Sequence, residues 1–266
     1  WKDKEDSVRK KAVEEVLAED KFSRQKAESS NPAVTKRSTA RSNPANIIES
    51  ESQKLTQLST ASGHATCFDY DSGFSHQHRA NFKVQNEQFK DSDNAYNDGE
   101  YTSIQQFMSV QMYRAMGMED AAREAKLEHD IEKQKEISKK WKSKLDEDKW
   151  PNKLMADTLY TAVSSKFNDP RNKNLLDTLL LTEGTKIIAA FAKNRIYGVH
   201  QTTNTEQGRQ SIQDESLKKN TPRKPLNLLG ETLQIFRDEK LKSLRPEIRQ
   251  QLEKKRTQFN PQVFDL

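Results

Sequence analysis

The sequence predicts a mainly α-helical α+β fold: a single central domain with a polar N-terminal arm and a C-terminal helical extension. Three observations predict it. Apolar residues recur at helical spacing in several segments, most clearly over residues 152–167. Turn residues and short apolar runs between 68 and 101 indicate a few short strands. Residues 1–63 hold few large apolar side chains, which is typical of a segment without a core of its own.

The N-terminal part, residues 1–63, is predicted to be one helix followed by an extended arm. Val8, Val13 and Val16 mark the apolar face of a helix over residues 6–18. Residues 23–63 are rich in Ser, Asn and Thr and contain two prolines. Ordering such a segment costs about 1–2 kcal/mol per residue in backbone entropy. We therefore expect neighbouring chains, or the rest of a larger protein, to hold the arm in place.

The central domain is predicted to span residues 64–241, and the extension residues 242–266. The strands and turns of 68–101 come first, and a polar insertion is expected at 201–222. Periodic apolar residues predict the helices of both parts, over 104–116, 152–167, 175–181, 227–241 and 246–256, with one or two charged helices over 119–144.

Several motifs, in order, resemble the NADAR or YbiA-like family of N-glycosidases. The most informative is Ser103-Ile104-Gln105-Gln106-Phe107, which is similar to the family's Ser-(Val/Thr)-Glu-(Gln/His)-(Tyr/Phe). The other matching segments are Ala80-Asn81-Phe82, Trp150 with Lys166-Phe167, Leu179 to Thr182, Asn194-x-x-Tyr197-Gly198, and Asn227-Leu228-Leu229-Gly230 with Arg237. The resemblance implies a NADAR-like domain over 64–241, and N-glycoside cleavage of ADP-ribose-like or riboflavin-precursor nucleotides.

The departures from the family pattern concentrate where the family carries its charges. Gln105 stands at the position of the family's Glu, and Met112 at that of its Lys. Ala189 replaces a second Glu, Asn194 an Asp, and Tyr197 a Trp. N-glycoside cleavage passes through an oxocarbenium-like state and needs a carboxylate to stabilise the cation or to activate water. We therefore interpret the chain as a pseudoenzyme with no confident catalytic residue.

Three function classes follow. The first is a non-catalytic structural or protein-binding module of a larger assembly, such as a particle coat, with protein partners or copies of itself. The second is an N-glycosidase with an unrecognised carboxylate, for which Glu100, Glu183 and Asp69 are the candidates. The third is a pseudoenzyme that binds a nucleotide or nucleic acid. The candidate ligand-binding residues are Trp150, Lys140, Lys166, Arg195 and Asn227.

Composition bears on the partners and the compartment of the protein. The formal net charge is +5 over 266 residues, and acids are interleaved with the basic residues, which permits contact with nucleic acid without demanding it. Apolar runs fall far below the roughly 18 residues of a membrane span, so no membrane partner is expected. The lone Cys67 favours a reducing, intracellular compartment, in the cytoplasm or within a particle.

No cofactor or metal site is predicted. The pair His76-x-His78 has a spacing that metal ligands use, but no Cys or further His follows at ligand distance. The chain opens on Trp1 and has no apolar leader segment. We therefore expect it to be a piece of a longer protein.

Overall fold

The computed structural model describes residues 44–60, 63–84, 99–192, 194, 196–213, 226–257, 259 and 261–264. These residues belong to one compact unit that begins at residue 42. The helix predicted over 6–18 and the first part of the arm lie outside the described residues.

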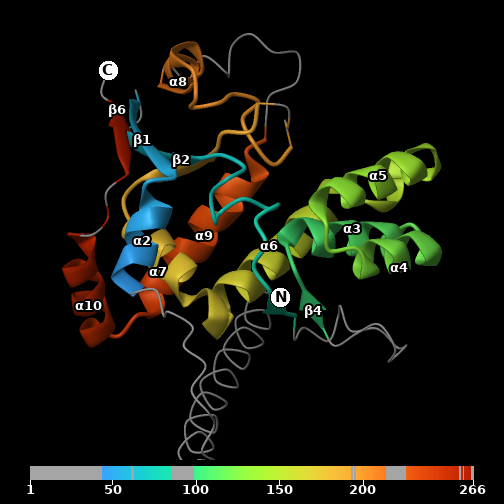
Figure 1. The fold of residues 1–266 in the computed structure, drawn as a ribbon, viewed down its shortest axis with the longest axis horizontal. Coiled ribbons are helices and arrows are strands. Elements are labelled where there is room, and N and C mark those ends of the chain that lie inside the picture. Colours follow the sequence, from blue (N-terminus) through green and yellow to red (C-terminus); the bar gives the residue numbers. More distant parts are fainter. Residues whose placement is uncertain are drawn as a thin grey trace, which may run out of the picture. The chain divides into compact units, whose positions relative to one another are not determined.

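The unit alternates short strands with longer helices (Figure 1). The strands are β1 (Leu55–Thr60), β2 (Gly63–Phe68), β3 (Phe82–Lys83), β4 (Glu100–Tyr101), β5 (Lys186–Ala189) and β6 (Gln262–Phe264). The α-helices are α2 (Pro44–Ser52), α3 (Ile104–Ala115), α4 (Glu119–Leu127), α5 (Ile131–Trp141), α6 (Asn152–Asn168), α7 (Lys173–Leu181), α8 (Glu206–Gln213), α9 (Leu228–Ser243) and α10 (Pro246–Arg256). Short 3-10 turns are η2 (Lys142–Lys144), η3 (Glu147–Lys149) and η4 (Pro170–Asn172).

Four strands form the main sheet, in the order β5-β2-β1-β6. β1 pairs antiparallel with β2, and Leu55 lies opposite Phe68. β5 joins β2 in parallel and β6 joins β1 in parallel. β3 and β4 form a separate antiparallel pair that leads into α3. The α+β, mainly helical class predicted from the sequence is confirmed.

The compact unit begins before the predicted boundary at residue 63. Residues 44–60 form α2 and β1, and β1 is an inner strand of the main sheet. Ile48, Leu55 and Leu58 are almost fully buried. These few apolar residues are grouped within eleven positions, so an average over 63 residues concealed a local core contribution.

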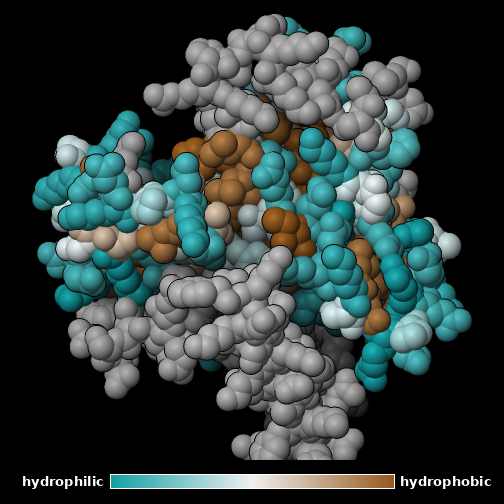
Figure 2. Space-filling view, turned by 180° about the vertical axis from the view of Figure 1, so that it is seen from behind, coloured by the Kyte–Doolittle hydropathy of each residue, from teal (hydrophilic) through white to brown (hydrophobic). Residues whose placement is uncertain are grey.

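The helices with strong apolar periodicity lie where the sequence predicts them. α6 packs against both α3 and α9 around the main core, which includes Phe107, Leu159, Phe167 and Phe236. α10 matches the prediction for 246–256 at both ends. Seen from behind in Figure 2, hydrophilic residues cover both flanks of the described surface, and hydrophobic residues gather toward its middle.

The C-terminal extension adds more than the predicted helix. Leu252 of α10 packs with Leu180 and Leu241, and β6 then extends the sheet alongside β1. The strand β6 has only three residues and follows Pro261, so no periodic pattern announced it.

Two further findings concern single features. Cys67 lies fully buried in β2, and burial raises the pKa of its thiol to about 12, so it is an unreactive packing residue. Within the described ranges, none of the helices combines the length and the apolar character that crossing a bilayer requires.

Candidate functional site

The two glutamines at the start of α3 have opposite surroundings. Ser103 caps the helix, since its Oγ accepts from the Gln106 N–H at 3.1 Å. Gln106 is fully buried, and its Nε2 donates to Lys126 O at 2.8 Å and to Glu128 O at 2.9 Å. Its Oε1 accepts from the Thr102 N–H at 2.9 Å. Gln106 therefore joins α3 to the end of α4 and has a structural role.

Gln105, the residue at the family's Glu position, is differently placed. Its backbone N–H donates to His76 O at 2.8 Å, which ties the start of α3 to the loop after β2. Its Oε1 is buried and has no hydrogen-bond partner among the described residues. A buried amide oxygen without a partner costs free energy, so this atom is a candidate contact for a ligand.

Three rings gather around His76, whose carbonyl accepts from the Gln105 N–H. Tyr70 stacks on Phe191 with ring centroids 4.3 Å apart and planes 13° from parallel. The His76 ring lies 5.1 Å from Phe191 and 5.0 Å from Tyr197. Tyr70 is 36 % exposed, whereas Phe191 is fully buried. We call Tyr70, His76, Phe191 and Tyr197 the aromatic cluster; its rings pack on one another, and Tyr70 is its most exposed member.

His76 is the polar member of the aromatic cluster. Its side chain is only 4 % exposed, and its Nδ1 has no partner within the described part of the chain. Burial, followed by the charges of Lys166 and Lys135, lowers the pKa of His76 to about 3. The His76 imidazole is therefore neutral at physiological pH. Burial raises the pKa of Tyr197 to about 12, so the Tyr197 hydroxyl is neutral as well.

Asn194 and Tyr197 share one turn. Asn194 Oδ1 accepts from the backbone N–H groups of Ile196 at 3.0 Å and Tyr197 at 2.9 Å, which is an Asx-turn. An aspartate would make the same two hydrogen bonds, so the turn itself tolerates either residue. Through Tyr197 and His76, the structure brings Asn194 and Gln105 into one neighbourhood.

The side chains of Ala189 and Met112 carry no polar group that could act on a ligand. Ala189 ends β5 and is fully buried, and its backbone N–H donates to Asn227 Oδ1 at 2.9 Å. Met112 packs, partly buried, against the main core. Both side chains act through packing alone.

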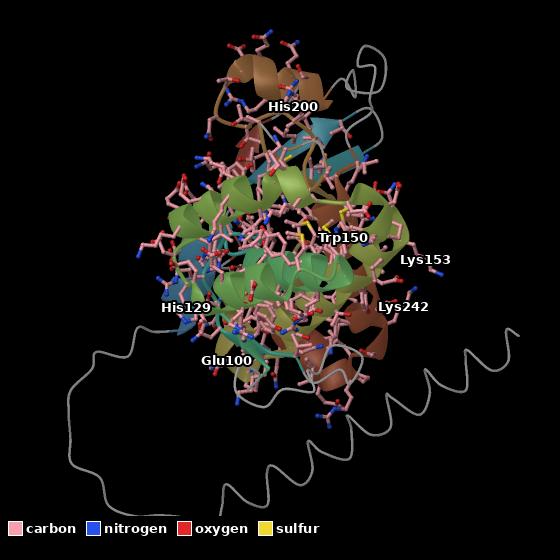
Figure 3. All side chains as sticks on the ribbon, turned by 90° about the vertical axis from the view of Figure 1, so that its right-hand side faces the viewer. Glu100, His129, Trp150, Lys153, His200 and Lys242 are labelled. Atoms are coloured by element: carbon pink, nitrogen blue, oxygen red, sulfur yellow. The ribbon has the colours of Figure 1, made fainter. Side chains whose placement is uncertain are left out.

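Trp150 stands at the entry of α6, half-buried against the main core. Figure 3 shows it on the same side of the unit as Lys153 and Lys242, and apart from His129 and Glu100. Among the described rings, it makes no ring contact with the aromatic cluster. The structure therefore does not join Trp150 to the cluster by direct contact.

Lys166 is a structural residue in this fold. Its Nζ is fully buried on α6 and donates to Gly73 O at 2.8 Å and Ser75 O at 3.2 Å. Burial lowers the pKa of Lys166 to about 7, and the charge of Glu51 opposes that shift. With its protons directed at backbone carbonyls, Lys166 cannot reach a ligand at the surface.

Lys166 should give stability a measurable pH dependence. Above pH 7 the folded chain releases a proton that the unfolded chain keeps up to about pH 10.5, so the free energy of unfolding rises through this window. Below pH 7 both states are protonated and the gain is absent. We expect a rise of up to about 1.4 kcal/mol per pH unit between pH 7 and 8.5 that Lys166→Met removes. Urea unfolding of both proteins across this range measures it, and equal slopes would contradict it.

Lys140 is engaged at the surface, and Arg195 lies outside the described residues. Lys140 Nζ pairs with Glu124 at 2.9 Å, and Trp141 Nε1 donates to the same carboxylate at 2.9 Å. These two hydrogen bonds lower the pKa of Glu124. Lys140 also lines a groove of about 630 Å³ between α4 and α5.

Asn227 uses both ends of its amide to extend the ladder of β5. Its Oδ1 accepts from Ala189 N, and its Nδ2 donates to Ile187 O at 2.9 Å. A Cβ on Gly230 would lie 2.6 Å from the Asn227 amide and would also clash with Ile187 O. The spacing Asn227-x-x-Gly230 thus has a packing explanation, and Asn227 has no free polar atom for a ligand.

Three members of the aromatic cluster were not predicted as site residues from the sequence: Tyr70, His76 and Phe191. His76 drew attention only through its spacing from His78, which suggested a metal pair. In the structure its ring turns to Phe191 and Tyr197 instead. Contacts between a loop and a distant strand end leave no periodic signal, so only the motif order could have indicated them.

Comparison with known proteins bears on the fold. The chain matches none of the curated proteins. The family model of the NADAR domain matches residues 65–241, which is more than half of the chain and includes α3, α6, β5 and α9. The chain therefore belongs to the NADAR domain family.

Proposed function

We propose that this NADAR domain does not cleave N-glycosides and acts as a binding module, as a structural or protein-binding part of a larger assembly. The observation that carries the proposal is the replacement of charge at the site. Gln105 places a neutral amide at the position of the family's Glu, and its Oε1 is buried without a partner among the described residues. A neutral amide cannot accept a proton or balance a forming cation.

The other matched positions support the same reading. Asn194 spends its Oδ1 on the backbone of its own turn, and Ala189 and Met112 contribute no polar side-chain group. His76 is neutral and buried, so the ring cluster supplies stacking surface rather than charge. These positions supply no charged group that could assist hydrolysis.

The alternative of an active N-glycosidase depends on a carboxylate from elsewhere. Glu100 pairs with Arg171, and Figure 3 shows it far from His200, which follows Tyr197 by three residues. Glu183 pairs with Arg249 of α10 at 2.6 Å. Asp69 is adjacent to Tyr70 of the aromatic cluster, and its Oδ1 accepts from the Asp71 N–H at 3.1 Å. Of the three candidates, Asp69 is therefore the one to test.

The nucleotide-binding alternative keeps support from the aromatic cluster alone. Lys166 is buried and Lys140 is paired, so neither cation is available for a phosphate in this structure. We expect a bound nucleotide, if one binds, to be held through its base.

The test is an assay for released base on the full chain, with an ADP-ribosylated guanine or a riboflavin-precursor nucleotide as substrate. We expect no release above the buffer control, and the double variant Gln105→Glu with Asn194→Asp to stay inactive because Met112 still replaces the Lys. Release by the unmodified chain that disappears in Asp69→Asn would support the glycosidase alternative instead. Equilibrium binding of the same nucleotides, without release, would favour the nucleotide-binding alternative.

A further inference from the structure

The loop that carries His76 is buried and held from two sides. Ser72, Phe74 and Ser75 are at most 1 % exposed. From α2, Glu51 Oε2 accepts from the Gly73 N–H at 3.0 Å. From α6, Lys166 Nζ donates to the carbonyls of Gly73 and Ser75.

Gly73 is the point where this packing is closest. A Cβ at this residue would lie 2.8 Å from Glu51 Oε2 and would clash with Leu175 of α7. The absence of a side chain lets the backbone approach the Glu51 carboxylate directly. The loop therefore has one close-packed position between α2, α6 and α7.

The same loop connects Gly73 to the candidate site. Its residue His76 accepts the Gln105 N–H through its carbonyl and contacts Phe191 and Tyr197 through its ring. A shift of Gly73 would move both contacts, because only two residues separate it from His76.

We propose that Glu51 is a positioning residue of the candidate site: from α2, which precedes the segment matched by the family model, it works with Lys166 to fix the Gly73–His76 loop, and through it His76 and Gln105. The residues before position 65 are then part of the site and not only an attached arm. The proposal rests on the candidate site being the binding site of the proposed function, but not on the absence of turnover.

We call the contacts of Glu51 and Lys166 with the Gly73–His76 loop the brace. The charges around the loop also depend on Glu51. Lys54, in the turn after α2, pairs with Glu51 Oε1 at 2.6 Å, so each carboxylate oxygen has its own partner. Glu51 raises the pKa of Lys166 against the effect of burial. Burial and then the charge of Lys166 lower the pKa of His78 to about 4, and Glu51 opposes this shift. Removal of the Glu51 charge should therefore be sensed at both Lys166 and His78.

The test uses NMR signals of the ligand-free full chain, which do not depend on turnover. Glu51→Ala removes the acceptor of Gly73, and we expect it to shift the imidazole signal of His76 and the amide signal of Gln105 while those of His129 and Gln106 stay in place. Lys54→Ala is the matched control, since it removes only the ion pair and should leave His76 and Gln105 nearly unchanged. A folded Glu51→Ala protein with unshifted His76 and Gln105 signals would overturn the proposal.

Glu51→Gln covers the case in which Glu51→Ala fails to fold. The glutamine keeps an acceptor for the Gly73 N–H and removes only the charge, so the loop should stay in place while the pKa of His78 falls further. Titration of the His78 imidazole signal measures this. An unchanged His78 titration would show that Glu51 exerts no charge effect at the loop and would count against the brace. Detection of released base would contradict the proposed function but would change neither NMR result. The proposed function and the role of Glu51 are therefore tested separately.

Discussion

Gln106→Leu should lower the free energy of unfolding by about 3 kcal/mol, although the new side chain is similar in size. The glutamine is fully buried and satisfies the Lys126 and Glu128 carbonyls and the Thr102 N–H. Leucine would leave these three backbone groups without this partner inside the fold. Urea unfolding monitored by circular dichroism measures the loss.

The adjacent residue provides the matched control. Gln105→Leu removes an amide oxygen that has no partner among the described residues, so we expect the free energy of unfolding to change by less than about 0.5 kcal/mol or to rise. Equal losses for the two variants would show that the distinction between a structural and a site glutamine is wrong.

Arg237→Met should lower the free energy of unfolding by about 3 kcal/mol as well. The Arg237 side chain is 3 % exposed, and its Nη1 donates to Thr182 O and Thr185 O, both at 2.8 Å. These bonds hold the turn between α7 and β5 against α9. Methionine fills part of the volume but removes both hydrogen bonds. Thr185 O then loses this buried donor, whereas Thr182 O still accepts from the Thr185 N–H and hydroxyl.

Arg249 is the control for Arg237, since it bonds to the same turn from the surface. Its guanidinium pairs with Glu183 at 2.6 Å, and its side chain is 52 % exposed. Exposed ion pairs contribute little, so Arg249→Met should cost less than about 1 kcal/mol. If Arg249→Met proves as costly as Arg237→Met, the turn is held from α10 as strongly as from α9, and the claim that exposure makes the Arg249 pair weak is wrong.

The sequence predicts the helices well because their apolar faces are long and regular. α3, α6 and α10 begin and end close to the predicted residues. The same periodicity indicates that Lys166 is buried, since it follows Leu159 by seven residues and so lies on the buried face of α6. A lysine on that face is not placed to bind a ligand at the surface. The spacing Ser103-x-x-Gln106 has the sequence pattern of a capping box, but Gln106 Oε1 accepts from the Thr102 N–H instead of the Ser103 N–H.

The remaining parts depend on contacts between distant segments. β1 is stabilised as a strand because it pairs with β2 and β6, and the short β6 because it pairs with β1. The aromatic cluster joins the loop after β2 to the end of β5, and no local pattern records that meeting. The family motifs indicated Tyr197, a member of the cluster, and Gln105 and Asn194 beside it, whereas the place of His76 in the cluster emerged only from the packing.

The most direct test of the central claim is a single-turnover assay with the chain in molar excess over an ADP-ribosylated guanine substrate, analysed by mass spectrometry for free guanine base. Excess protein reveals even a slow chemical step, because each substrate molecule needs to be bound and cleaved only once. We predict that no free base accumulates beyond the rate in buffer, since Gln105, Ala189 and Asn194 place no carboxylate at the matched positions. Release of free base above that rate, removed by Asp69→Asn in a protein that still folds, would contradict the account and identify an active N-glycosidase.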